Sequence, residues 1–169
     1  MSVTQLIPQD ACPTSREGYA PTRSLVQSLA ELAPYLSRRV ARCRRAGEQL
    51  AMLWIELAPL PSPADDNEDV LAELMLTASL RVRNRVRGTD EVVQVGDLGF
   101  AVLLPGAGSP EAAVVGLRLR QTLTGTYGLK SGQAYLSVAM GEAVYPEAGL
   151  TGTDLAEAAQ RSLAMRQGG

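Results

Sequence analysis

The chain has 169 residues, of which 46% are apolar and 20% charged, and its formal net charge at pH 7 is −2. This composition is typical of one globular domain with a substantial core. Histidine is absent, which excludes the most common general base, the most common zinc ligand and every Ser/His or Cys/His nucleophilic arrangement. The two cysteines, Cys12 and Cys43, are too few and too far apart to predict a disulfide framework or a metal site. This favours a protein of the reducing interior of the cell.

Charge and hydropathy also limit the expected partners. A slightly acidic chain needs a local basic patch to bind nucleic acid. The arginines between Arg38 and Arg45 form such a cluster, but no aromatic side chains accompany them for base stacking, so no nucleic-acid partner is predicted. No apolar run approaches the roughly 20 residues that cross a bilayer, and the N-terminus lacks a signal-peptide pattern. We therefore expect a cytoplasmic protein that does not insert into a membrane.

The N-terminal part of the chain divides into a tail and a helix. Residues 1–21 carry scattered prolines without periodicity, which predicts a flexible tail. Residues 22–48 predict a helix capped by Thr22 or Ser24, with Pro34 kinking or splitting it. Its apolar residues recur at three- and four-residue steps: Leu25, Leu29, Leu32, Leu36, Val40 and Cys43. We expect the stripe of Leu29, Leu32, Leu36 and Val40 to pack on the domain or on a second chain, with the cluster from Arg38 to Arg45 in solvent.

Strands and helices alternate in the remainder of the chain. Residues 49–57 form an apolar run typical of a buried strand, and residues 58–67 predict only a loop. The later predictions are a helix from Glu68 to about Val86, strands over 91–95 and 100–105 joined by a turn at Gly96–Gly99, a helix over 110–123, a strand over 133–146 and a helix from Thr153 to Leu163. This order predicts an α+β fold of the ferredoxin-like, split βαβ type: an N-terminal helix precedes an antiparallel sheet with helices packed on one face.

Charges of opposite sign lie at the two ends of the helix predicted from Glu68. Acidic residues occupy its first turn, and arginines occupy its end, as the helix dipole favours: Arg81, Arg83, Arg85 and Arg87. The dipole explains the sign of these charges, though not their density. An anionic ligand beside the arginines is the alternative explanation.

From about Leu50 to Gly169 the chain resembles a GGDEF domain, the diguanylate cyclase fold, which makes cyclic di-GMP from two GTP molecules at a homodimer interface. The resemblance rests on an ordered series of segments: LAMLWIEL, VRGTD, GDLGF, FAVLLPG, LRLRQTL, LSVAMGEAVYP and DLAEAAQRSLAMR. It implies that residues 49–169 form one domain with this nucleotide-cyclase-like fold.

The signature of the family is degenerate in this chain. Aligned on Phe100, the five signature residues read Gly96, Asp97, Leu98, Gly99 and Phe100, so Gly99 stands where a glutamate would hold metal. Phosphoryl transfer of this kind needs carboxylates to hold Mg²⁺ against the triphosphate, and only Glu56 could still serve. The family's guanine and triphosphate contacts are not matched in residues 60–67. We therefore expect a protein that is not an enzyme, with no catalytic residue, metal site or cofactor.

A regulatory motif of the family is retained. In the family, Arg-x-x-Asp ending six residues before the signature is the inhibitory site, where intercalated cyclic di-GMP binds; here it reads Arg87-Gly88-Thr89-Asp90. The arginine that the family places on the following helix corresponds to Arg118. A guanidinium can fork onto phosphate or a guanine edge, and a carboxylate can accept from guanine donors. The resemblance implies a cyclic di-GMP site at Arg87, Asp90 and Arg118, with Arg87 and Asp90 as an exposed pair.

Two functions follow from these patterns. In the first, the protein is a catalytically inactive cyclic di-GMP receptor that signals to a protein partner or acts as a homodimer. In the second, Arg87 only interacts favourably with the helix dipole, and Asp90 only caps the turn into the next strand. The fold is then an interaction module that binds no nucleotide. Nothing in the sequence chooses among exopolysaccharide export, motility and virulence as the pathway.

Overall fold

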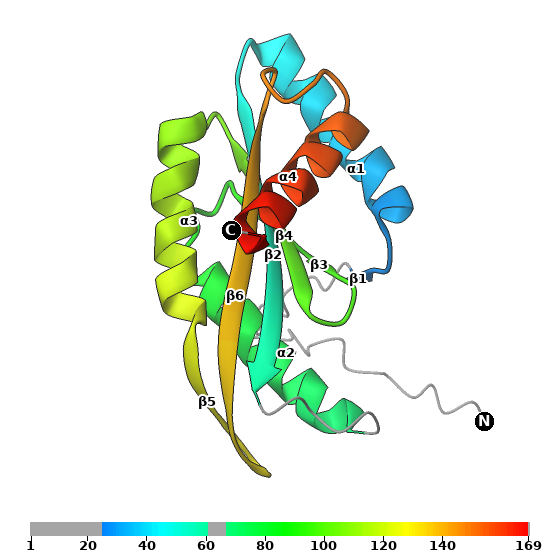
Figure 1. Ribbon diagram of the computed structural model, residues 1–169. Coiled ribbons are helices and arrows are strands. Elements are labelled where there is room, and N and C mark those ends of the chain that lie inside the picture. The colour runs from blue at the N-terminus through cyan, green and yellow to red at the C-terminus, as the bar shows by residue number, and fades with distance from the viewer. Residues whose placement is uncertain (1–24, 61–66, 169) are drawn as a thin grey trace, which may run out of the picture.

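The computed structural model describes residues 25–60 and 67–168, so the predicted tail over residues 1–21 lies outside the described residues. A six-stranded sheet in the order β1-β3-β4-β2-β6-β5 forms the middle layer (Figure 1). Its pairings are antiparallel except that of β1 with β3, and the predicted α+β fold is confirmed. The elements are β1 (Leu25–Val26), α1 (Leu29–Ala46), β2 (Leu50–Leu60), α2 (Glu68–Arg83), β3 (Glu91–Val95), β4 (Gly99–Pro105), α3 (Ser109–Leu123), β5 (Gly125–Leu129), β6 (Gly132–Tyr145) and α4 (Gly152–Gln167).

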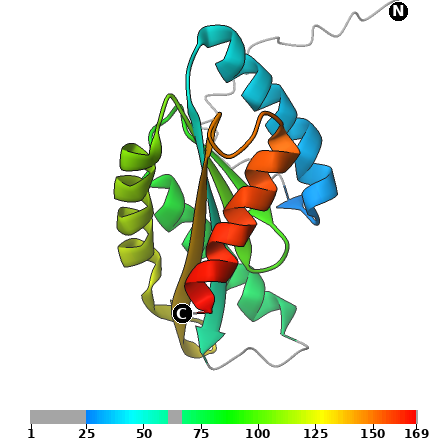
Figure 2. The same ribbon diagram turned by 45° about the horizontal axis from the view of Figure 1, so that its top comes forward.

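Helices cover both faces of the sheet. The helices α2 and α3 pack on one face, and α1 and α4 pack on the other (Figure 2). The prediction of helices on one face only is therefore wrong. The reason lies in β2, where every residue from Leu50 to Ile55 is buried: successive side chains point to opposite faces, so both faces of this strand are apolar and both need a cover.

The helix α1 begins later than predicted. Ser28 caps it, because its Oγ accepts a hydrogen bond from the Glu31 N–H at 3.4 Å. Leu25 and Val26 form β1, which pairs with Gln94 and Val95 of β3, so the predicted helix is wrong over residues 25–28. The proposed caps Thr22 and Ser24 lie outside the described residues. Pro34 does not split α1, which runs unbroken to Ala46.

The apolar stripe of α1 packs on the domain. Leu32, Leu36, Val40 and Cys43 are buried against α4 and the sheet, as one of the two predicted arrangements requires. Burial raises the pKa of the Cys43 thiol. On the solvent side, Arg38, Arg42, Arg44 and Arg45 are exposed, as expected for the basic cluster, whereas Arg39 Nε lies 2.8 Å from a carboxylate oxygen of Glu91 on β3.

The strand β2 is longer than predicted, because Ala58, Pro59 and Leu60 continue it. The N–H of Leu57 donates to the Leu98 carbonyl at 2.8 Å, which shows that this side of Leu57 faces the hairpin. The nitrogen of Pro59, two residues further, points to the same side, beyond the end of β4, where no donor is needed. A proline is therefore tolerated in this strand, and the prediction of a loop from residue 58 is wrong there.

Two features at the C-terminal end of the chain also differ from the predictions. The strand β5 was not predicted, because glycines at two of its positions, Gly125 and Gly128, weaken the strand pattern. The last helix α4 is capped by Thr151 and reaches Gln167, so it is longer than predicted at both ends. None of the helices in residues 25–60 and 67–168 is long and apolar enough to cross a membrane.

Gly141 sets the distance between α4 and the sheet. A Cβ atom on this residue of β6 would lie 2.0 Å from the Ala159 carbonyl oxygen and 2.4 Å from the Leu163 backbone nitrogen. Both contacts are with helix backbone, which cannot rotate away as a side chain can. The backbone of α4 therefore rests directly on the strand at this glycine.

We expect Gly141→Ala to lower the free energy of unfolding by about 1–3 kcal/mol, the usual range for overpacking a core. Urea denaturation followed by circular dichroism measures this. Gly128→Ala in β5 is the matched control: nothing lies within 4 Å of its added Cβ, so its effect should stay within about 0.5 kcal/mol. Equal effects of the two substitutions would contradict the close approach of α4.

Candidate functional site

The arginine-rich segment leaves the helix earlier than predicted. The helix α2 ends at Arg83 with Asn84 as its C-cap, and residues 84–90 form the connection to β3. Arg85, Val86 and Arg87 therefore lie on a connection and not on the last helical turn. Their side chains are not held to helical spacing.

Two of the four arginines are half-buried and bind carbonyl oxygens of neighbouring elements. Arg81 donates to the Thr122 and Thr126 carbonyls at 3.4 and 3.5 Å, and its guanidinium lies 3.8 Å from the centre of the Tyr127 ring. Burial raises the pKa of the Tyr127 hydroxyl, although the Arg81 cation acts in the opposite direction. Arg83 donates to the Val92 carbonyl at 3.1 Å. These two side chains hold α2 against α3, β5 and β3.

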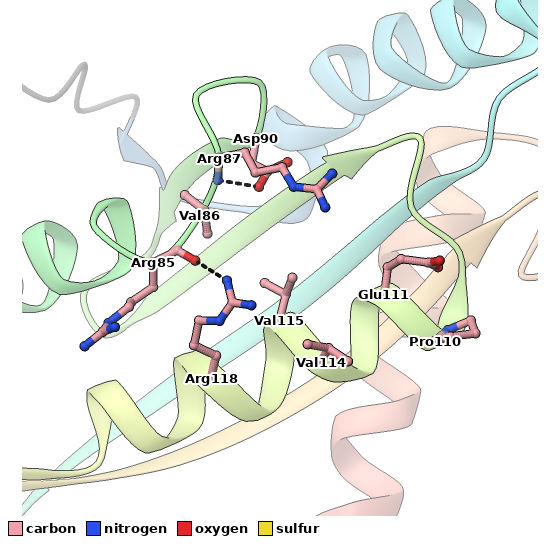
Figure 3. A pocket seen from close by; sticks show the side chains of 9 residues that line it. All are labelled: Arg85, Val86, Arg87, Asp90, Pro110, Glu111, Val114, Val115 and Arg118. Atoms are coloured by element: carbon pink, nitrogen blue, oxygen red, sulfur yellow. Dashed lines mark hydrogen bonds between the residues drawn. The ribbon is translucent and has the colours of Figure 1, made fainter.

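The other two arginines line a hollow between the connection and α3 (Figure 3). The hollow has a volume of about 260 Å³ and includes all three residues that the sequence predicted: Arg87, Asp90 and Arg118. Arg118 reaches from α3 and donates to the Arg85 carbonyl at 3.3 Å. The remaining lining residues are Arg85, Val86, Pro110, Glu111, Val114 and Val115.

Asp90 is part of a tight turn. Its Oδ2 accepts from the Arg87 N–H at 2.7 Å, and its own N–H donates to the Arg87 carbonyl at 3.1 Å. Only 6% of Asp90 is exposed. The prediction of an exposed Arg87–Asp90 pair is therefore wrong: Asp90 is buried, and its carboxylate binds the backbone N–H of Arg87 (Figure 3). Among the described residues, no ion pair joins the two side chains.

Sequence reasoning did not select Glu111 as a site residue. It is the third residue of α3, and its Oε2 accepts from the Gly108 N–H at 3.0 Å. In a sequence, a glutamate at this position predicts a helix start and nothing else. Only the packing of α3 beside the connection places it in the hollow.

The hairpin between β3 and β4 borders another hollow. Its lining residues are Trp54, Glu56, Leu57, Val95, Leu98 and Gly99. Trp54 Nε1 donates to Glu56 Oε1 at 3.4 Å. A Cβ on Gly99 would lie 2.7 Å from the Val95 carbonyl oxygen and 3.2 Å from the Ile55 carbonyl oxygen, so the backbone leaves no room for a side chain there. Among the described residues, no three acidic or cysteine side chains gather as metal ligands do.

Solved GGDEF domains share this architecture. The GGDEF domain of YfiN (TpbB) from Pseudomonas aeruginosa has a TM-score of 0.67 and 25% sequence identity, over 82% of this chain and 89% of that one. The fold is that of a GGDEF domain. No model of a known protein family matches the sequence, and no curated protein matches it.

Two more distant structures are similar in fold alone. The active GGEEF domain of a diguanylate cyclase from Vibrio cholerae has a TM-score of 0.68 and 13% identity, over 87% of this chain and 94% of that one. The GGDEF domain of DgcB from Caulobacter crescentus, solved in complex with cyclic di-GMP, has a TM-score of 0.65 and 13% identity, over 99% of this chain and 94% of that one. Because one of these relatives in fold is active, the fold does not decide between cyclase and receptor.

Removal of the Asp90 carboxylate should weaken the fold, whereas removal of the Arg87 side chain should not. Asp90→Ala leaves the partly buried Arg87 N–H without its acceptor, which should cost about 1–3 kcal/mol of unfolding free energy. Arg87→Ala removes an exposed side chain and should change stability by less than about 0.5 kcal/mol. Urea denaturation of both variants tests this, and equal stability of the two would show that the Asp90 bond contributes nothing to the fold.

Proposed function

We propose that this protein is a catalytically inactive receptor for cyclic di-GMP, acting in the cytoplasm without a metal or cofactor. It binds the dinucleotide at Arg87, Asp90 and Arg118 and passes the signal to a protein partner. The observation that carries the proposal is the hollow that gathers these three residues from the α2–β3 connection and from α3. The complex of cyclic di-GMP with the GGDEF domain of DgcB supports the choice of ligand.

The cations of the hollow suit a ligand with two phosphates. Within the described residues, the guanidiniums of Arg85 and Arg87 form no hydrogen bond or ion pair with another residue. Guanidinium groups bind phosphate oxygens through two parallel hydrogen bonds. Val86, Val114 and Val115 add apolar surface against which a base can lie. The hollow therefore offers separate surfaces for phosphates and for bases.

The hairpin supports the absence of catalysis. Leu98 and Gly99 cannot coordinate a metal, and the Val95 carbonyl occupies the space that a side chain at position 99 would need. Among the described residues that line the hairpin hollow, Glu56 is the only carboxylate. A single carboxylate does not assemble the metal site that phosphoryl transfer requires.

One observation favours the alternative of a nucleotide-free interaction module. Val114 and Leu117 of α3 are 58% and 59% exposed. Large exposed apolar side chains on one helix are typical of a surface that meets another protein. A receptor also needs such a surface, so nucleotide binding is the measurement that separates the two functions.

Calorimetry of the full chain should detect cyclic di-GMP binding. Arg87→Ala should weaken it about tenfold to a hundredfold, because a charge-assisted hydrogen bond to the ligand is lost. Arg161→Ala, an exposed arginine on α4 and so on the opposite face of the sheet, is the matched control and should bind as the unaltered chain does. Absence of heat from the unaltered chain at high ligand concentration would favour the interaction module.

Incubation with GTP and Mg²⁺ or Mn²⁺ should yield no cyclic di-GMP on chromatography. Leu98→Asp together with Gly99→Glu should not restore the product, because the new side chain at position 99 clashes with the Val95 carbonyl. Product from either protein would refute the proposed loss of catalysis.

A further inference from the structure

We propose that Glu111 is a second carboxylate that recognises guanine, and that with Asp90 it makes the hollow selective for guanine over adenine. The proposal rests on the receptor function above and extends it to a residue of α3. Glu111 and Asp90 line the same hollow from different elements, α3 and the α2–β3 connection (Figure 3). Among the described residues that line the hollow, no other is acidic.

A cyclic dinucleotide of guanine needs more acceptors than Asp90 can supply. Each guanine presents two neighbouring donors, N1–H and the N2 amino group. Asp90 has one oxygen bound to the Arg87 N–H and is only 6% exposed, so one oxygen with limited access remains for the ligand. The three arginines of the hollow, Arg85, Arg87 and Arg118, cannot accept from the guanine donors, because guanidinium groups only donate hydrogen bonds.

Glu111 has a free oxygen in a fixed position. Its Oε2 is held by the Gly108 N–H at 3.0 Å, and no residue in the described part of the chain donates to its Oε1. The residue is exposed to solvent, so Oε1 is open to a ligand. Capping of α3 accounts for one oxygen and leaves the other available. The same bond that caps the helix orients the carboxylate and lowers the entropy lost on binding.

The chemistry of the two purines makes this arrangement selective. A carboxylate accepts from the N1–H and N2 amino group of guanine. Adenine has an acceptor at N1 and no amino group at C2, so a carboxylate on that edge meets a lone pair and is repelled. We therefore expect cyclic di-GMP to bind much more tightly than cyclic di-AMP.

Glu111→Gln tests the assignment by calorimetry with both dinucleotides. A glutamine oxygen can still accept from the Gly108 N–H, so α3 keeps its cap, but the amide nitrogen then turns a donor toward the guanine donors. We expect cyclic di-GMP affinity to fall about tenfold to a hundredfold. Cyclic di-AMP affinity should not fall, so the ratio of the two affinities should decrease.

Two further variants make the outcome decisive. Glu157→Gln removes an exposed glutamate from α4 and should leave both affinities unchanged. Glu111→Asp keeps the charge but withdraws the carboxylate by one methylene, and should also weaken cyclic di-GMP binding. If Glu111 acted only by repelling phosphate, Glu111→Gln would raise the affinities for both dinucleotides equally. That result, or an unchanged ratio of the cyclic di-GMP affinity to the cyclic di-AMP affinity, overturns the assignment. Failure of the unaltered chain to bind cyclic di-GMP would instead refute the receptor function, and the assignment with it.

Discussion

The burial of β2 on both faces is the constraint on which the other layers depend. This strand pairs with β4 on one side and β6 on the other, and its side chains form the middle of two separate cores. One core requires α2 and α3, and the other requires α1 and α4. The candidate ligand site follows from the first requirement: α2 and α3 must lie side by side, which brings Arg118 next to the connection that leaves α2.

Much of the fold could be predicted from the sequence because its elements have strong local patterns. The run LAMLWI, the periodic apolar residues of α1 and the glycines of the β3–β4 turn each specify one element. Two of the missed parts depend on contacts that are distant in the sequence. Pro59 stays in a strand only because β4 has already ended beside it, and β1 is a strand only because the edge of β3 is open to it.

The candidate site also combines features that the sequence predicts with features that depend on the folded structure. The spacing of Arg87, Asp90 and Arg118 could be matched to the family motif, and the structure places the three residues in one hollow. The burial of Asp90 could not be predicted, because it results from a turn that closes on the backbone of Arg87. Glu111 gave no signal beyond that of a helix start. A residue with an ordinary structural role is identified as a possible ligand contact only when its neighbours in space are known.

The two arginines of α2, Arg81 and Arg83, bind carbonyl oxygens, whereas in the proposed function Arg85 and Arg87 of the connection offer their charge to a ligand. A guanidinium bound to a carbonyl interacts with a dipole at contact distance, and dissolved ions screen such a short interaction weakly. In that function, the attraction of Arg85 and Arg87 for a ligand with two negative charges would act over longer distances and would be screened beyond about 10 Å at 0.1 M ionic strength. The stability of the fold and the affinity of the hollow should therefore respond differently to added salt, although the same residue type supports both.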